Sequence, residues 1–222
     1  ITGGDSGIGR AVAVLFAREG ADVAIIFLPQ ERSDAEETAQ AIEGEGRKAL
    51  LIPGDVTDPD FCVSASRHTI KTFGKIDVLV NNAGFQKNQN KLEDVTEEQW
   101  DHTFRTNIYG YFHMVKAVVP HMQPGSSIVN TGSITGLEGE KTLLDYSATK
   151  GAIHAFTKTL AQMLTDRKIR VNAVAPGPVW TPLNPSAKSA DEVAKFGADV
   201  TFGRPAQPEE LAPAYVSLAS NI

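Results

Sequence analysis

The sequence has a single cysteine, Cys62, among its 222 residues, so it offers no internal disulfide. Chains without disulfides are typical of reducing compartments, and we therefore expect a cytoplasmic location. We interpret Cys62 itself as a small hydrophobic residue packed in the core.

Long apolar runs and an excess of basic residues are also lacking. No run approaches the roughly 20 apolar residues that a membrane-spanning helix needs, and no signal peptide is visible. Lys and Arg number 21 against 27 Asp and Glu, which gives a net charge of −6. Nucleic acids are therefore not the expected partners, because neutralising their phosphates needs a basic face, and the lack of a long apolar run argues against a membrane partner. The five histidines are scattered, and no His, Cys, Asp and Glu cluster has metal-ligand spacing, so no metal is predicted.

Strand and helix patterns alternate along the chain. Short runs rich in Val, Ile and Leu predict strands at 22–28, 48–53, 75–80, 126–131 and 168–175. Helical spacing follows at 11–20, 33–45, 58–73, 96–122, 146–166 and 208–220, with Ser33, Asp58 and Thr96-x-x-Gln99 as expected N-terminal caps. This order predicts a single α/β domain with a doubly wound parallel sheet and helices on both faces.

The first helix is preceded by a glycine-rich loop with glycines at positions 3, 7 and 9. Such a loop brings free backbone N–H groups and the positive end of a helix dipole to one place, which suits a pyrophosphate. The spacing G-x-x-x-G-x-G differs from the commonest dinucleotide fingerprint, G-x-G-x-x-G. A plain glycine-rich turn that starts a helix is the alternative interpretation.

Other irregular polar stretches also follow predicted strands. They begin at Asp55, Asn81, Ser133 and Pro176. In parallel sheets ligands bind at the carboxyl ends of the strands, so we expect these stretches to converge on one edge of the sheet.

Tyr146 and Lys150 lie four residues apart in a predicted helix and therefore share one face. A phenol has a pKa of about 10, and a nearby ammonium favours the phenolate, so we expect Lys150 to lower the pKa of Tyr146. The pair could then exchange a proton with a reacting oxygen. Many helices carry such a pair without any chemical role.

Taken together, the motifs resemble the short-chain dehydrogenase/reductase family across essentially the whole chain. The matching residues are Thr2-Gly3-x-x-x-Gly7-Ile8-Gly9, Asp55-Val56, Asn81-Asn82-Ala83-Gly84, Asn107, Ser133, Tyr146-x-x-x-Lys150 and Pro176-Gly177-x-x-x-Thr181. The resemblance implies a Rossmann-type three-layer α/β/α fold and an NAD(P)-dependent oxidoreductase. Phe27-Leu28-Pro29 and the stretch from Pro176 to Leu183 look like the glucose/ribitol dehydrogenase-like, general-stress-protein branch.

The resemblance also implies a role for each catalytic candidate. Tyr146 would be the acid or base, Lys150 would lower its pKa and bind the nicotinamide ribose, Ser133 would hydrogen-bond the substrate oxygen, and Asn107 would hold a water that links Lys150 to solvent. The implied cofactor-binding residues are Gly3, Asp5, Ser6, Gly7, Ile8, Gly9, Phe27, Leu28, Asp55, Val56, Asn82, Ala83, Gly84, Tyr146, Lys150, Pro176, Gly177, Val179 and Thr181.

The cofactor preference leans slightly to NADP(H). An NAD-preferring enzyme usually has an acid at the end of the second strand, where this chain has Phe27. Arg32 and Arg10 are the nearest cations for a 2′-phosphate, while Asp5 and Glu31 oppose one.

The expected substrate is a small aldehyde, ketone, sugar or polyol, held by residues 85–91, 134–143 and 183–203. Trp180 is a candidate pocket residue or an ordinary structural aromatic. A redox sensor that binds the dinucleotide without turnover is the alternative function, although the four catalytic candidates together argue against it.

Two further expectations rest on the resemblance. The chain begins where the first, central strand should end and stops before a last strand, so we expect a fragment with segments absent at both ends. The apolar helices at 96–122 and 146–166 pair across subunits in this family, which predicts a homodimer or homotetramer.

Overall fold

The computed structural model describes residues 1–183 and 190–220. Its strands are β1 (Val23–Phe27), β2 (Ala49–Pro53), β3 (Val78–Asn81), β4 (Ser127–Thr131) and β5 (Arg170–Val174). Its α-helices are α1 (Gly7–Arg18), α2 (Arg32–Gly44), α3 (Pro59–Phe73), α4 (Glu97–Phe104), α5 (Gly110–Val118), α6 (Thr135–Glu138), α7 (Leu144–Met163), α8 (Ala190–Ala194) and α9 (Pro208–Ala219). Short 3₁₀ turns are η1 (Pro29–Glu31), η2 (Leu92–Asp94), η4 (Val119–His121) and η5 (Thr165–Arg167), and η3 (Arg105–Tyr109) is a π-helical turn.

The sheet is parallel and is built in two pieces, β1–β2 and β3–β4–β5. Residues 1–3 lie between the pieces and join them, because Gly3 N donates to Ile26 O (2.8 Å) and Thr2 N donates to Val80 O (3.0 Å). A cavity of about 290 Å³ also lies between β1 and β3, lined partly by Ile1, Val23 and Leu79. The further strands expected before residue 1 and after residue 222 stay a prediction.

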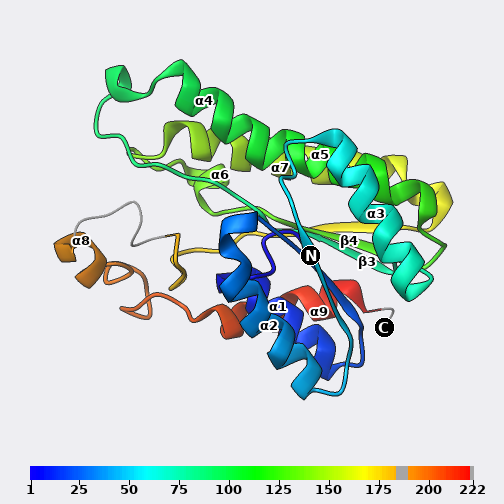
Figure 1. Cartoon of the computed structure of the whole chain (residues 1–222). Coiled ribbons are helices and arrows are strands. Elements are labelled where there is room, and N and C mark those ends of the chain that lie inside the picture. The colour runs from blue at the N-terminus through cyan, green and yellow to red at the C-terminus, as the bar shows by residue number, and fades with distance from the viewer. Residues whose placement is uncertain (184–189, 221–222) are drawn as a thin grey trace.

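Helices cover both faces of this sheet (Figure 1). α1, α2 and α9 lie on one side, and α3, α4, α5 and α7 lie on the other. Each face has its own buried core: Ile25 and Phe27 pack toward α1 and α2, whereas Ile26 and Ile128 pack with Met114 beneath α5. The alternation along β1 thus buries successive side chains on opposite faces. The predicted three-layer, doubly wound α/β/α fold is confirmed.

Of the caps predicted at Asp58 and Ser33, the structure contains only the first. The Asp58 carboxylate accepts from Asp60 N (2.9 Å) and Phe61 N (3.3 Å) and so caps α3 as expected. The prediction of Ser33 as a cap is wrong, because α2 already begins at Arg32. A 3₁₀ turn precedes it, and Glu31 accepts from Leu28 N (3.0 Å) to close that turn.

The helix predicted at 96–122 is interrupted. Thr96 caps its start by accepting from Gln99 N (3.2 Å), as predicted, but the Gln99 side chain turns inward to other partners. The π-helical turn η3 then separates α4 from α5 and carries Asn107, and such turns occur frequently at functional sites. Throughout the described chain, no helix has the length and apolarity required to cross a membrane.

Candidate active site

A cavity of about 420 Å³ opens at the carboxyl ends of the strands. Its wall combines the loop before α1, the ends of β1, β2 and β3, and the start of α7. Predicted residues in the wall are Gly3, Asp5, Ser6, Gly7, Ile8, Phe27, Leu28, Asp55, Val56, Asn82, Ala83, Gly84, Tyr146, Lys150 and Thr181. The structure thus brings together most of the residues that the sequence singled out, from segments far apart in the chain.

The loop before α1 is shaped by glycine. Gly3 and Gly7 have positive φ angles of 60° and 50°. Gly9 is required by close approach, because a Cβ there would lie 1.8 Å from the carbonyl oxygen of Gly3. Within the described residues, Ser6 makes no capping hydrogen bond and the first turn of α1 carries no acid. The first N–H groups of α1 therefore remain available to an anion, and this wall fits a pyrophosphate.

Two carboxyl groups lie at the β1 side of the cavity. Asp5 is 3% exposed, and burial raises its pKa above the ordinary value. Burial also raises the pKa of Glu31, with a further contribution from the negative charge of Asp5. Both side chains line the cavity, so a bound phosphate in this region would meet negative charge unless a cation accompanied it.

Lys150 and Tyr146 face the cavity from α7. Lys150 is 2% exposed, and its Nζ donates to the carbonyl oxygen of Thr131 (2.8 Å). The same Nζ lies 5.3 Å from the centroid of the Tyr146 ring. Burial without a carboxylate partner lowers the pKa of Lys150 to about 7.

The expected lowering of the Tyr146 pKa is not what the structure shows. Burial raises the pKa of Tyr146 to about 12, and a hydrogen bond with Ser133 offsets only part of that rise. The physical reason is that desolvation disfavours the phenolate, while Lys150 is itself desolvated and directs its Nζ to Thr131 O. The phenol of Tyr146 is therefore neutral at pH 7 in this structure.

Asn107 and Ser133 stand behind the cavity wall. Asn107 is fully buried, accepts from Phe85 N at Oδ1 (2.7 Å), and donates from Nδ2 to Phe85 O (2.9 Å). Ser133 Oγ accepts from Thr135 N (3.2 Å) and from Thr135 Oγ1 (3.0 Å). Asn107 thus fixes the backbone of Phe85, while Ser133 lies within hydrogen-bonding reach of Tyr146.

Four predicted cofactor residues do not line the cavity. Gly9 packs behind Gly3, for the reason given above. The carbonyl oxygen of Pro176 accepts from Ile134 N (3.0 Å), Gly177 has no heavy atom within 4 Å of a would-be Cβ, and Val179 is 5% exposed and bridges to Ala206. Pro176 and Val179 therefore contact neighbouring segments, Gly177 faces open space, and Thr181 reaches the wall.

The sequence missed several residues of the wall. They are Ile26, Gly54, His102, Thr106, Thr131 and Pro182, whereas Phe85 and Leu183 belong to the predicted substrate-side segments 85–91 and 183–203. Glu31, expected as a charge that opposes a 2′-phosphate, also lines the cavity. Thr131 ends a predicted strand two residues before Ser133, and that position was a usable signal. His102 and Thr106 lie four residues apart in the helix predicted at 96–122, but periodicity alone does not show which face of that helix meets the cavity.

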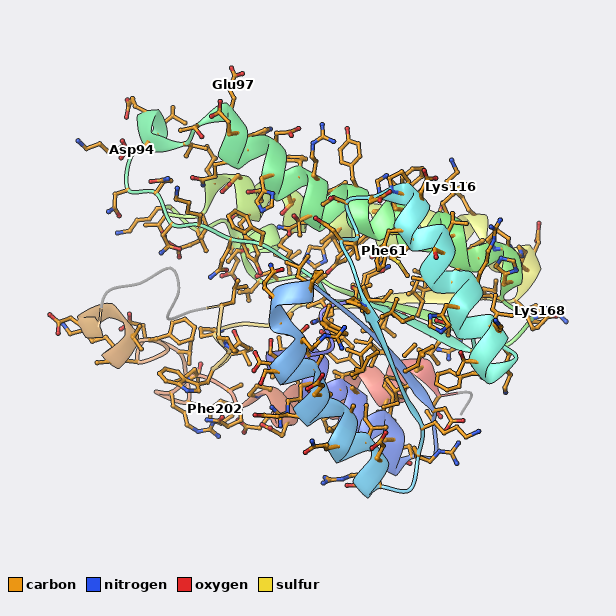
Figure 2. All side chains as sticks on the ribbon, in the orientation of Figure 1. Phe61, Asp94, Glu97, Lys116, Lys168 and Phe202 are labelled. Carbon is orange, nitrogen blue, oxygen red and sulfur yellow. The ribbon has the colours of Figure 1, made fainter. Side chains whose placement is uncertain are left out.

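The remaining substrate-side predictions are placed in part. Trp180 is 44% exposed, and its ring centroid lies 6.4 Å from that of Phe196, outside the cavity wall. Phe202, 87% exposed, lies in the segment between α8 and α9 (Figure 2). Residues 184–189 of the predicted 183–203 segment lie outside the described residues.

Among residues 1–183 and 190–220, no group of three His, Cys, Asp or Glu side chains is placed to hold a metal ion.

A family model described as enoyl-(acyl carrier protein) reductase matches residues 3–222. General stress protein 39 of Bacillus subtilis is 53% identical over 221 residues, which is 100% of this chain and 76% of the relative. The chain belongs to the short-chain dehydrogenase/reductase family.

Further relatives in this family carry functional names. The NADPH-dependent aldehyde reductase 1, chloroplastic, of Arabidopsis thaliana is 46% identical, covering 100% of this chain and 78% of its own. The glucose and ribitol dehydrogenase of Daucus carota is 48% identical, covering 99% and 77%. The resemblance to the glucose/ribitol dehydrogenase-like, general-stress-protein branch is confirmed.

Solved structures of the family show both nicotinamide cofactors. A short-chain dehydrogenase from Burkholderia cenocepacia in complex with NADP has a TM-score of 0.91 and 32% identity, covering 99% of this chain and 89% of that one. A 3-ketoacyl-(acyl-carrier-protein) reductase from Brucella melitensis complexed with NADH has a TM-score of 0.89 and 33% identity, covering 100% and 89%. The chain is an NAD(P)-dependent oxidoreductase, and the prediction of an enzyme is confirmed.

Proposed function

We propose that this enzyme reduces a small carbonyl compound, an aldehyde, ketone or sugar, with Tyr146 as the proton donor. The observation that carries the proposal is the neutral Tyr146 phenol in the cavity, next to Lys150 and Ser133. A phenol whose pKa is about 12 stays protonated at neutral pH and can give its proton to a developing alkoxide. The reverse reaction, alcohol oxidation, needs the phenolate and is expected to improve as the pH rises.

The chain supplies binding and proton handling at this site. A bound nicotinamide contributes the hydride chemistry. The glycine loop and the first N–H groups of α1 would hold the pyrophosphate, and Lys150 would hold the ribose next to it. Ser133 would donate to the substrate oxygen, so that two uncharged hydroxyls polarise the carbonyl.

The relatives' names and this chemistry support the proposed substrate class. One relative is named an aldehyde reductase and another a glucose and ribitol dehydrogenase. Aldehydes and open-chain sugars both present an unhindered carbonyl oxygen, which a hydroxyl pair can bind. The test offers the enzyme a panel of aldehydes, ketones, sugars and polyols and monitors turnover by the change in nicotinamide absorbance. Turnover of a carbonyl supports the proposal; cofactor binding with no turnover of any panel member contradicts it.

We further propose NADP(H) as the preferred cofactor, with Arg32 as the cation for the 2′-phosphate. The Arg32 guanidinium carbon lies 6.0 Å from the ring centroid of Phe27, which lines the cavity, and its ion pair with Glu36 is long at 3.6 Å. Glu31 limits this preference because its carboxylate lines the same end of the cavity.

Kinetics with both cofactors test this preference. Arg32→Gln should lower the ratio of kcat/KM for NADPH to that for NADH, and Glu31→Gln should raise it. Arg10, whose guanidinium bonds Glu37 at 3.1 Å, provides the control variant Arg10→Gln, for which little change is expected. A wild-type ratio that favours NADH, unchanged in Arg32→Gln, would overturn the assignment.

We propose that the protein is a homodimer or homotetramer that pairs through α4, α5 and α7. Tyr109 (51% exposed) and Phe112 (47% exposed) present aromatic surface beside α4 and on α5, and Met163 (71% exposed) presents an apolar thioether side chain at the end of α7. Light scattering on the purified protein measures the assembly, and Phe112→Glu should shift it toward smaller species. A monomeric wild type at micromolar concentration would refute the proposal.

A cytoplasmic location is proposed from the single cysteine. Cys62 is a buried free thiol, and burial raises its pKa to about 12. The thiol is therefore protected from oxidation in a reducing and in an oxidising compartment alike. Fractionation of cells that express the full-length protein tests the location, and recovery outside the cytoplasmic fraction would contradict it.

A further inference from the structure

A row of buried polar side chains joins α4 and η3 to α7. We name this row the polar seam and define it as Gln99, Thr103, Asn107, Asp145 and Thr149. Gln99 is 7% exposed and the other four are fully buried. The members on each helix are four residues apart, so each helix contributes one face to the seam.

The centre of the seam is the carboxylate of Asp145. Its Oδ2 accepts from Thr103 Oγ1 (2.6 Å) and from Gln99 Nε2 (3.0 Å), and its Oδ1 accepts from Tyr146 N (2.9 Å). All three donors are uncharged. A buried carboxylate is tolerated only where such donors replace water, so the three contacts hold one another in place.

On one side the seam fixes the loop that follows β3. Gln99 Oε1 accepts from Gln89 Nε2 (2.7 Å), and Gln99 Nε2 also donates to Lys87 O (3.3 Å). Asn107 bonds both the N–H and the carbonyl oxygen of Phe85. The seam therefore contacts this loop at residues 85, 87 and 89, and Phe85 lines the cavity.

On the other side the seam fixes the backbone of Tyr146. Asp145 Oδ1 accepts its N–H, and Thr149 Oγ1 donates to its carbonyl oxygen (2.7 Å). Asn107 Nδ2 donates to the same Thr149 hydroxyl (3.0 Å). The substrate-side loop and the proton donor are thus attached to one network of buried hydrogen bonds.

We propose that Gln99, Thr103 and Asp145 are positioning residues that set the place of residues 85–89 relative to the Tyr146 hydroxyl. None of the three lines the cavity, so they act through Phe85 and Tyr146. The proposal rests on the proposed carbonyl reduction by Tyr146. Displacements of about 1 Å can change rates by roughly 100-fold, which makes a rigid seam valuable for turnover.

The first experiment compares Thr103→Val with Thr103→Ser. Valine keeps the shape of threonine and loses the hydroxyl that bonds Asp145, whereas serine keeps that hydroxyl. We expect Thr103→Val to lower kcat for carbonyl reduction roughly tenfold or more. Thr103→Ser should retain most of the activity. The dissociation constant of NADPH should be unchanged in both, because the glycine loop lies on the other wall.

The second experiment is a double-mutant cycle across the contact between Gln99 and Asp145. Gln99→Glu places a second carboxylate against Asp145 and should lower both kcat and Tm. Asp145→Asn supplies an N–H₂ group that can donate to the new glutamate, so the double variant should recover much of the loss. Gln40→Glu, the same change at an exposed position of α2, is the control.

These experiments distinguish a failure of the positioning role from a failure of the proposed carbonyl reduction. A fall in Tm with kcat unchanged in Thr103→Val would show a structural role only and would overturn the inference, as would a double variant no better than Gln99→Glu. If a single variant fails to fold, the recovery in the double variant still decides. A wild-type enzyme that binds NADPH and reduces no carbonyl would refute the proposed function instead.

Discussion

The two walls of the cavity are made in different ways. The wall before α1 depends on glycines, because a residue without a Cβ lets one stretch of backbone approach another closely. The wall at α7 depends on side chains that are present and buried, namely Lys150 on Thr131 O and the polar seam around Tyr146. The first wall fits a phosphate, and the second positions a proton donor.

This difference predicts that the two walls can be damaged separately. An added methyl group on the glycine wall should weaken cofactor binding before it affects chemistry. A lost hydroxyl on the α7 wall should reduce turnover while the cofactor still binds. Each variant below is measured for NADPH dissociation, for turnover and for stability, so that the separation can be checked.

The largest effect is expected for Gly9→Ala. Its Cβ would lie 1.8 Å from Gly3 O, and a backbone atom cannot move aside without displacing the loop. We expect NADPH binding to be lost and unfolding free energy to fall by about 1–3 kcal/mol. Gly44→Ala, at a site with no atom within 4 Å, is the control and should fold and bind normally. Unaltered NADPH affinity in Gly9→Ala would disprove the account of this wall.

Lys150→Met should change how stability depends on pH. The folded-state pKa of Lys150 is about 7, below the ordinary 10.5, so between these values the unfolded chain holds the extra proton. Stability of the cofactor-free wild type should therefore rise with pH across this window, by up to about 1.4 kcal/mol per pH unit. Lys150→Met should remove that slope and lose turnover.

Urea denaturation of both proteins at pH 6.5 and pH 9 measures the slope. An identical pH dependence in the two proteins would contradict the assignment of a buried, depressed Lys150.

Gly136→Ala should have an intermediate effect. A Cβ there would lie 2.5 Å from the carbonyl carbon of Lys150, where α6 packs directly on α7. The strain should move α6 and with it Ser133, so kcat should fall while NADPH affinity changes less. Titration and turnover on the same preparation check this, and a loss of affinity without a loss of kcat would reverse the assignment of α6 to the α7 wall.

Gly177→Ala should have the smallest effect. The family resemblance assigns Gly177 to cofactor binding, but the structure places it away from the cavity wall with open space around it. We expect a change of less than about twofold in NADPH dissociation, which corresponds to about 0.4 kcal/mol. A tenfold weakening would favour the resemblance over the geometry.

The glycine wall could be predicted from sequence because its information is local. Gly3, Gly7 and Gly9 lie within seven residues and predict both the loop and the helix after it. The fold was predictable for a similar reason, since strand and helix periods alternate without a break. Ser33 was misplaced as a cap because Glu31 closes the preceding turn, a competition between neighbouring caps that spacing alone does not resolve.

The α7 wall could be predicted only in part, because it depends on contacts between segments that are far apart in the sequence. Tyr146 and Lys150 are visible as a spacing, yet the pKa values depend on burial that the spacing does not show. Gln99 was assigned to a helix cap, and its real partners lie at residues 87, 89 and 145. Hydrogen bonds between segments more than 40 residues apart, such as that from Gln99 to Asp145, appear only once the chain is folded.

The most direct measurement is turnover and NADPH titration of Tyr146→Phe in the full-length enzyme. The phenylalanine keeps the ring in the cavity wall and removes only the hydroxyl. We expect kcat to fall by about 100- to 10,000-fold with NADPH affinity nearly unchanged. Carbonyl reduction at the wild-type rate by Tyr146→Phe would contradict the central claim that this phenol supplies the proton.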